Sequence, residues 1–182
     1  MTAAIFFRRV LRLFSWLLAL FVVLSIGSVL AFRWIDPPTS AFMLREPYPI
    51  RHRWVDWANT SAHIKVAVIA AEDQNFPVHY GFDLKSINDA LVDRQRGRRV
   101  RGASTISQQV AKNLFLWPGQ NWFRKGLEAA LTVLIEATWS KQRILEVYLN
   151  IAEFGRGTWG VEAASQRYFG KSAARLTRAD AA

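Results

Sequence analysis

The longest apolar stretch of the chain lies near its N-terminus, where residues 13–32 carry no charged side chain. At a rise of about 1.5 Å per residue, a helix of this length spans about 30 Å, the thickness of the hydrocarbon core of a bilayer. A cleaved signal peptide is the alternative, but its apolar region is usually only about 7–15 residues long and ends at small residues. The length of the stretch therefore favours a transmembrane anchor.

Beyond residue 40, apolar positions recur at helical spacing. Leu84, Ile87 and Leu91 fall on one helix face, and the leucines of residues 127–135 fall on another. Residues 64–71 are apolar almost throughout, which favours a buried helix over a strand. Alternation of apolar and polar residues, which indicates a half-buried strand, is nearly absent. The pattern predicts a mainly α domain after the anchor.

Capping residues indicate where later helices begin and end. Ser140 precedes a helix expected over 141–150, and Gly170 follows one expected over 161–169. Thr177 and Asp180 have the spacing of a capping box. With a stiff Pro-Pro linker after the anchor, the expected segments are a cytoplasmic tail (1–12), a transmembrane anchor (13–32), a linker (33–44) and a folded domain (45–182).

The distribution of charge predicts the orientation of the anchor and limits the chemical class of the ligand. The chain has 24 Lys and Arg against 14 Asp and Glu, a net charge of +10. Arg8, Arg9 and Arg12 precede the anchor, which predicts a cytoplasmic N-terminus and places residues after Phe32 on the outer face of the cytoplasmic membrane. The cationic excess indicates an anionic ligand, and export argues against nucleic acid. The absence of cysteine excludes thiol nucleophiles and disulfides.

The densest basic run covers residues 94–101, where five of eight residues are Arg. It is interpreted as a solvated basic loop beside anionic lipid headgroups. A phosphorylated, membrane-embedded substrate would explain both this charge and the anchor.

Three polar stretches carry candidate chemistry. Glu72 and Asp73 end the apolar segment 64–71, where a carboxylate against low dielectric is suited to proton transfer. The alternative is a solvated helix end followed by turn residues. In the second stretch, Ser104 or Thr105 caps a helix whose free N–H groups attract anions, and the polar residues that follow suit sugars and phosphate. A capped helix with a polar outer face is the alternative there.

In the third stretch, Arg124 and Lys125 lie four and three residues before Glu128, so the three side chains share a helix face. A structural ion pair is the simple explanation. However, cations at a helix start oppose the macrodipole, and acid before base is the more stable order. This arrangement lowers the stability of the helix by roughly a few tenths of a kcal/mol, and it provides a strong anion-binding site.

Together and in this order, the motifs resemble those of the peptidoglycan glycosyltransferases, the transferase domain also found in bifunctional penicillin-binding proteins. The resemblance covers residues 45–182. The matching positions are Glu72, Asp73, Phe76, His79 and Gly81, then residues 102–109 with Lys112 and Asn113, then Arg124, Lys125 and Glu128, then Lys141, Ile144, Leu145, Glu146, Tyr148, Leu149 and Asn150, then residues 160–164.

The resemblance implies a mainly helical, partly lysozyme-like domain behind the anchor, C-terminally truncated because family members continue past the position of Ala182. It also implies a hydrophobic lobe that dips into the membrane, for which residues 114–117 are a candidate beside core packing. The implied activity is polymerisation of lipid II, a disaccharide-pentapeptide on undecaprenyl pyrophosphate, into glycan strands. The growing chain is the donor, and transfer to the 4-hydroxyl of the acceptor sugar inverts the anomeric configuration.

The roles of the site residues also come from the resemblance. Glu72 matches the general base, and Glu128 matches a second essential carboxylate that organises either the cations or a divalent metal, magnesium or manganese, around the leaving pyrophosphate. The residues expected to neutralise the diphosphate are Lys112, Arg124 and Lys125. Those expected to position donor sugars and phosphate are Ser104, Thr105, Gln108, Gln109 and Asn113. Those expected to support the base and shape the acceptor side are Asp73, Phe76 and His79.

No organic cofactor is expected, and proteins of cell-wall synthesis or division are possible partners. Two other classes of protein stay open: a lysozyme-type peptidoglycan hydrolase and a non-catalytic, membrane-anchored cell-wall scaffold. A hydrolase needs neither cations for a pyrophosphate nor a bilayer anchor, so the charge and the stretch at 13–32 argue against it. Elongation of labelled lipid II would distinguish the three.

Overall fold

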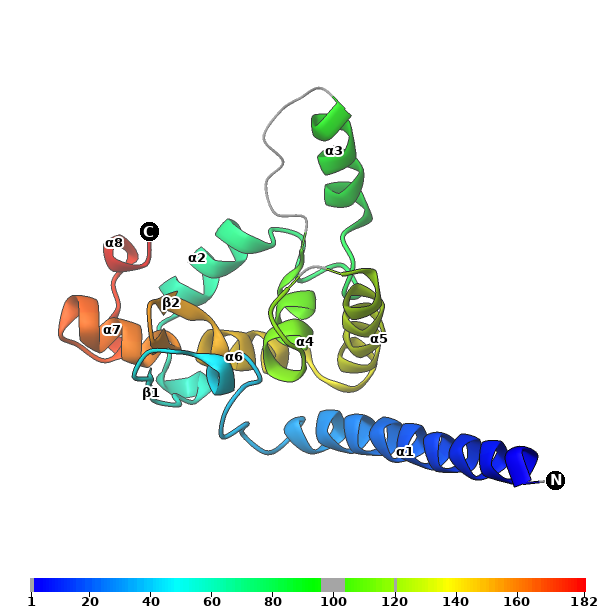
Figure 1. Cartoon of the computed structure of the whole chain (residues 1–182). Helices are drawn as coiled ribbons and strands as arrows, with labels where there is room; N and C mark the ends of the chain where they lie inside the picture. The colour runs from blue at the N-terminus through cyan, green and yellow to red at the C-terminus, as the bar shows by residue number, and fades with distance from the viewer. Residues whose placement is uncertain (1, 96–103, 120) are drawn as a thin grey trace. The chain divides into compact units, whose positions relative to one another are not determined.

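The computed structural model describes residues 2–95, 104–119 and 121–182 (Figure 1). The chain divides into two compact units, of which the first ends at Asp36 and the second begins at Pro37. The boundary falls inside the linker expected over residues 33–44, while the four expected segment boundaries themselves stay a prediction. The described residues omit 96–103, so most of the predicted basic loop lies outside them.

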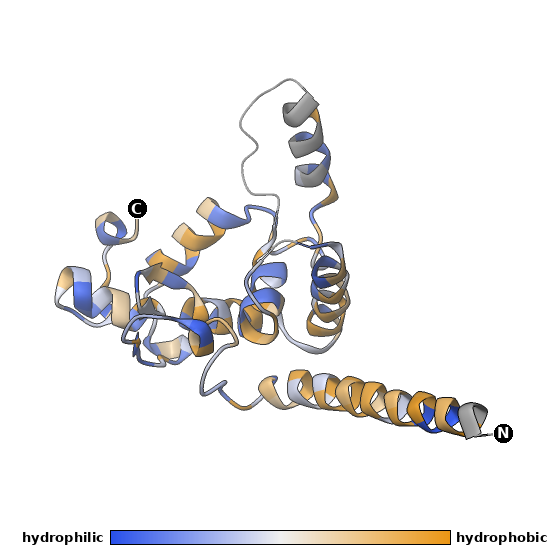
Figure 2. Ribbon diagram, in the orientation of Figure 1, coloured by the Kyte–Doolittle hydropathy of each residue, from blue (hydrophilic) through white to orange (hydrophobic). Residues whose placement is uncertain are grey.

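The first unit is built on helix α1 (Thr2–Phe32), which begins well before the predicted anchor. Among the described residues, Ile5–Phe32 is the one helical segment that is long and apolar enough to cross a membrane. Figure 2 shows it orange along most of its length, with hydrophilic residues near the N-terminus. The hydroxyl groups of Ser15 and Ser28 donate to the carbonyl oxygens of Leu11 and Ser25, both at 2.9 Å. These bonds lower the cost of placing serine in a lipid environment.

The second unit is mainly helical, as predicted. Its helices are α2 (Ala62–Glu72), α3 (Leu84–Gln95), α4 (Ile106–Phe115), α5 (Trp122–Thr138), α6 (Lys141–Ile151), α7 (Val161–Phe169) and α8 (Arg178–Ala181), with single 3-10 turns at Met43–Arg45, Trp57–Asn59 and Ala173–Arg175. Helix α4 packs against both α5 and α6. The core lies between these three helices, where Ile106, Val110, Ile135, Ile144 and Val147 are fully buried.

The predicted helix ends are confirmed. The side chain of Ser140 caps α6 by accepting a hydrogen bond from the Arg143 N–H at 3.1 Å. Gly170 ends α7 in the left-handed conformation, with φ of 63°. Thr177 and Asp180 form the predicted capping box at the start of α8.

Two predictions about burial are changed by the structure. Residues 64–71 are helical as predicted, but the expectation of a buried helix is wrong, since Ile64 and Val68 are buried while Val66 is 66% exposed. A segment that is apolar all round does not reveal which of its faces will pack. Of the residues considered for membrane contact, Leu114 and Leu116 are buried in the core, which favours the packing alternative at both.

A small sheet was not predicted. Within the described residues it has three strands, β1 (Arg51–His52), β2 (Glu153–Gly155) and β3 (Thr158–Trp159), in the order β1-β3-β2. Strand β3 pairs in parallel with β1 and antiparallel with β2. Strands of two or three residues are too short to show alternation, so periodicity does not detect them.

The second half of the expected linker, at the start of the second unit, is hydrogen-bonded to the end of α4. The N–H groups of Ala41 and Phe42 donate to the carbonyl oxygens of Leu114 and Asn113, at 3.1 and 3.2 Å. The Phe42 ring also lies 5.7 Å from the ammonium group of Lys112. Residues at the start of the second unit therefore brace the helix that carries several candidate site residues.

Candidate active site

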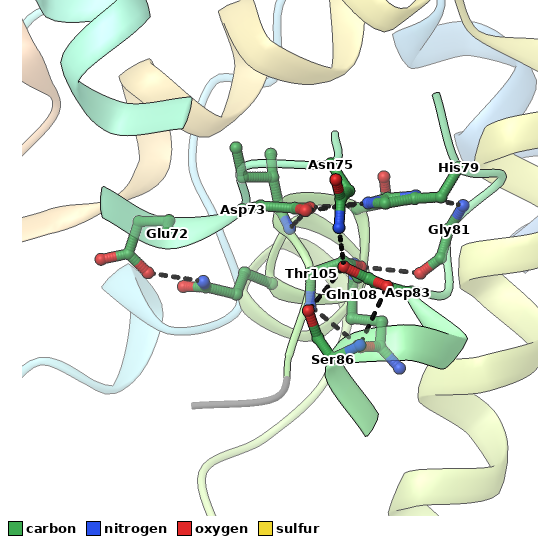
Figure 3. A network of polar contacts seen from close by, with 12 residues as sticks. Glu72, Asp73, Asn75, His79, Gly81, Asp83, Ser86, Thr105 and Gln108 are labelled. Carbon is green, nitrogen blue, oxygen red and sulfur yellow. Dashed lines mark hydrogen bonds and ion pairs between the residues drawn. The ribbon is translucent and has the colours of Figure 1, made fainter. Parts of the chain in front are cut away.

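Glu72 is the last residue of α2, and its side chain is exposed. Its carboxylate oxygen Oε2 accepts a hydrogen bond of 2.8 Å from Nε2 of Gln109, on the neighbouring helix α4 (Figure 3). No other hydrogen bond or ion pair to Glu72 is found among the described residues. The second carboxylate oxygen, Oε1, is therefore available to an external group.

Asp73 differs from its neighbour because it is buried and fully bonded within the domain. Its carboxylate lies 2.9 Å from Nε2 of His79 and accepts a 2.9 Å hydrogen bond from the Ile106 N–H (Figure 3). The other ring nitrogen of His79 accepts from the Gly81 N–H at 3.1 Å, which assigns the proton to Nε2. Asp73 therefore joins the end of α2 to the start of α4.

At the start of α4, a capping box takes up hydrogen-bonding groups that would otherwise be available to a ligand. Thr105, not Ser104, is the capping residue, and its side chain and backbone bond reciprocally to Gln108. The Thr105 hydroxyl also donates to the Gly81 carbonyl at 2.7 Å. Gly81 has φ of 85°, and a Cβ there would lie 2.7 Å from Thr132 Cγ2, so the turn requires glycine. Thr105 and Gln108 are thus buried members of the framework.

Asp83 is a site-forming residue that the sequence analysis missed. Its carboxylate accepts bonds from the Asn75 side chain at 2.7 Å and from the Ser86 hydroxyl and N–H at 2.6 and 3.0 Å. The hydrogen bonds from Ser86 and Asn75 lower the pKa of Asp83 to about 2. Asp-x-x-Ser directly before an apolar helical pattern is a capping signal that could have identified it.

Phe76 is a buried residue in the turn between α2 and α3. It is 2% exposed and meets the ring of His79 edge-on, with centroids 6.2 Å apart. The ammonium group of Lys141 lies 4.6 Å from the Phe76 ring centre and 2.7 Å from Glu136, which also accepts from Ser107. Phe76 therefore supports the site from the interior of the domain.

The three charged residues at the start of α5 form the ion pairs that were the simpler explanation of their spacing. Both oxygens of Glu128 are engaged, one by Arg124 at 3.0 Å and the other by Lys125. Glu128 and Arg124 are buried, whereas the Lys125 side chain is 43% exposed. The buried Nε of Arg124 has no hydrogen-bond partner among the described residues. The group therefore keeps one unused donor and one cation that faces solvent.

Lys112 connects this charged group to Glu72. Burial lowers the pKa of Lys112, the charges of Arg124 and Lys125 lower it further, and those of Glu128 and Glu72 raise it. Both carboxylates thus act on the same ammonium group. Lys112, on α4, therefore lies within range of the charges of both Glu72 and Glu128.

Two surface pockets meet at Ser104, which is half-buried. One, of about 450 Å³, is lined by Ser104 with Asn121, Trp122, Arg124 and Lys125. The other, of about 340 Å³, includes Ser104, Glu72 and Asp73. Asn113 lies half-buried on the last turns of α4, where its carbonyl accepts from Phe42. The structure therefore separates the predicted site residues into two sets. The residues that line one or both pockets are Glu72, Asp73, Ser104, Thr105, Arg124 and Lys125, and those that line neither are Phe76, His79, Gln108, Gln109, Lys112, Asn113 and Glu128.

The described side chains do not by themselves build a site for a divalent cation. In the part of the chain that the structure describes, no three His, Asp or Glu side chains gather. Both oxygens of Glu128 already accept from cations. The expectation of magnesium or manganese stays a prediction.

Comparison with known proteins gives consistent matches. A family model described as Transglycosylase matches residues 41–182. A protein of Pseudomonas putida strain KT2440 named biosynthetic peptidoglycan transglycosylase is 53% identical over 184 residues, which cover 96% of this chain and 76% of that protein. Proteins of the same name from Shewanella frigidimarina and Pasteurella multocida are 55% and 51% identical, covering 89% and 97% of this chain and 72% and 74% of theirs.

Proposed function

The chain belongs to the transglycosylase family, and we propose that Glu72 is the general base with which it polymerises lipid II into glycan strands. The family membership makes it a peptidoglycan glycosyltransferase whose substrates are lipid II and the growing glycan chain. One observation carries the proposal for the site. The pocket lined by Glu72 and the pocket lined by Arg124 and Lys125 share Ser104 as a lining residue, so an acid and two cations lie around adjoining hollows.

The position of Glu72 supports its role as base. Its exposed carboxylate is held through Oε2 by Gln109, while Oε1 is available to take the proton of the acceptor 4-hydroxyl. The hydroxyl oxygen then attacks the anomeric carbon of the donor sugar. The bond from that carbon to the pyrophosphate oxygen breaks with its electron pair, and the configuration changes from α to β.

The charged group at α5 suits the leaving diphosphate. Lys112, Arg124 and Lys125 supply positive charge where negative charge develops, which is the form of stabilisation that lowers the barrier most when the donors are already in place. The unpartnered Nε of Arg124 is buried, so it would become a further donor only if the side chain shifted toward the diphosphate. Glu128 holds Arg124 and Lys125 in fixed positions through its two oxygens, so its contribution is to organise the cations.

The proposal includes the location of the reaction. One candidate membrane helix lies within the described residues, and the Arg residues that precede its uncharged stretch support a cytoplasmic N-terminus and a domain on the outer face. Lipid II presented at that leaflet would reach the site while its lipid stays in the membrane. Proteins of cell-wall synthesis or division are proposed as partners from the family resemblance alone.

The test is elongation of labelled lipid II by the full chain in liposomes. Glu72→Gln keeps the shape and the contact with Gln109 but removes the basic carboxylate, so we expect elongation to stop while lipid II still binds. Glu46→Gln, which changes a carboxylate in the segment before β1, is the matched control and should elongate normally. Retained turnover in Glu72→Gln would contradict the general-base role, and cleavage of finished glycan by the unmodified chain would indicate a hydrolase instead.

A further inference from the structure

Tyr148 is a buried residue that belongs to none of the roles assigned so far. It lies on the face of α6 that packs against α4 and is 6% exposed. Its hydroxyl lies 3.5 Å from Oε1 of Gln109, and the described residues offer it no other hydrogen-bond partner. Since a buried tyrosine hydroxyl normally has a partner, the Gln109 amide is its natural acceptor.

The orientation of the Gln109 amide determines whether it can donate a hydrogen bond to Glu72. Its Nε2 donates to the Glu72 carboxylate at 2.8 Å, and an ionised carboxylate can only accept. If the amide were reversed, its oxygen would face the carboxylate and the contact would become repulsive. A hydroxyl donor at Oε1 favours the productive orientation, because a phenol proton can bond only to the oxygen end of the amide.

Electrostatics gives a second, independent link between Tyr148 and the site. Burial raises the pKa of Tyr148 far above its ordinary value, and the negative charge of Glu72 raises it further. The hydroxyl therefore keeps its proton at every pH at which the enzyme would work, so it is always a donor. The same effect shows that the charge of Glu72 reaches across Gln109 to the Tyr148 hydroxyl.

We propose that Tyr148 is a positioning residue for the general base: its hydroxyl orients the Gln109 amide, which in turn holds the Glu72 carboxylate in place to take the proton. The inference rests on the proposed role of Glu72. A separation of 3.5 Å is long for a hydrogen bond, and bonds of this kind commonly shorten when substrate closes a site. Tyr148 itself touches neither substrate nor the reacting atoms.

The first test removes only the hydroxyl. Tyr148→Phe should lower kcat for lipid II elongation roughly threefold to tenfold, the effect of losing one hydrogen bond. The KM for lipid II should stay within about twofold of its original value, because the lost contact acts on the base rather than on substrate binding. Tyr168→Phe, whose hydroxyl donates to the Phe154 carbonyl, is the matched control and should leave kcat unchanged. Thermal unfolding of each variant reports on the fold.

A double-mutant cycle separates positioning from simple packing. Gln109→Leu removes the amide, so adding Tyr148→Phe to it should cause no further loss of kcat. A purely structural role would make the two losses multiply, and that result, or an unchanged kcat in Tyr148→Phe, would overturn the inference. Glu72→Gln is measured alongside. Turnover in Glu72→Gln refutes the proposed base, whereas an inactive Glu72→Gln beside a fully active Tyr148→Phe refutes only the positioning role.

Discussion

The junction of α2 with α4 and the start of α5 both bury charged side chains, but they do so in opposite ways. We call the first group, Asp73, His79, Thr105 and Gln108, the clasp, and the second, Lys112, Arg124, Lys125 and Glu128, the cationic cluster. In the clasp, the polar groups bond to one another or to nearby backbone. In the cationic cluster, Arg124 and Lys125 pair with the carboxylate of Glu128, and Lys112 lies within range of their charges. Arg124 keeps an unpartnered Nε, and Lys125 is partly exposed.

This difference distinguishes the residues that hold the site together from the residues that remain available to bind a ligand. A satisfied network stabilises one geometry, whereas an excess of cations with unused donors stabilises an anion that is not part of the chain. Glu72 and Asp73 show the same division at adjacent positions, since one is exposed with a free oxygen and the other is buried with none. Sequence proximity does not give two carboxylates the same function.

The largest effect, a loss of folding stability, is expected from a substitution that disrupts the clasp. Asp73→Ala leaves the His79 Nε2 and the Ile106 N–H without their acceptor, so the free energy of unfolding should fall by about 3 kcal/mol. Glu72→Ala is the matched change one residue earlier and should alter it by less than about 0.5 kcal/mol. Urea unfolding of the two variants in detergent measures both values. Equal losses would show that the clasp and the base do not differ as described.

A smaller effect is expected when one cation is removed from the cationic cluster. Lys125→Ala leaves Glu128 paired with Arg124 and so spares the fold, but it removes a charge that faces the pocket. Affinity for undecaprenyl pyrophosphate should fall about tenfold, the usual effect of one charge-assisted hydrogen bond. Arg156→Ala, a change at an exposed arginine outside the cluster, is the control for overall charge and should bind normally. Unaltered affinity in Lys125→Ala would remove this residue from the diphosphate site.

The smallest expected effect is a dependence on pH. Because burial lowers the pKa of Lys112 below its ordinary 10.5, the ammonium group loses its proton earlier than a free lysine does. Affinity for the diphosphate should therefore decline modestly as the pH rises toward the ordinary pKa of lysine, in the interval where a free lysine would still be charged. Folding stability should change in the opposite direction, rising over the same interval, because the unfolded chain then binds more protons than the folded one. Lys112→Arg, which stays charged, should keep its affinity across the range, and a parallel decline in both proteins would contradict this assignment.

The sequence predicts features that depend on neighbouring residues. Caps at Ser140, Gly170 and Thr177 are confirmed because each signal and its effect lie within one or two helical turns. The ion pairs of Glu128 follow from helical spacing for the same reason. The expected helical character of the domain, summed over many such signals, is confirmed as well.

Features that depend on distant contacts were not predicted. Asp73 is buried because the start of α4, 33 residues later, supplies the Ile106 N–H, and Glu72 is held by a residue 37 positions away. Neither contact leaves a trace in local periodicity, so the residue pattern alone does not distinguish the two carboxylates, and their separate roles followed only from the family resemblance. The role of Thr105 in the framework likewise depends on a distant contact, because its hydroxyl donates to the carbonyl of Gly81, 24 residues earlier.

The fastening of Ala41 and Phe42 to the last turn of α4 has a mechanical consequence. If the N-terminal segment were pulled, the force would pass through these two hydrogen bonds to the end of α4, the helix that carries Gln109 and Lys112. Because Gln109 holds the Glu72 carboxylate, a displacement of α4 would also displace the contact that positions the proposed base.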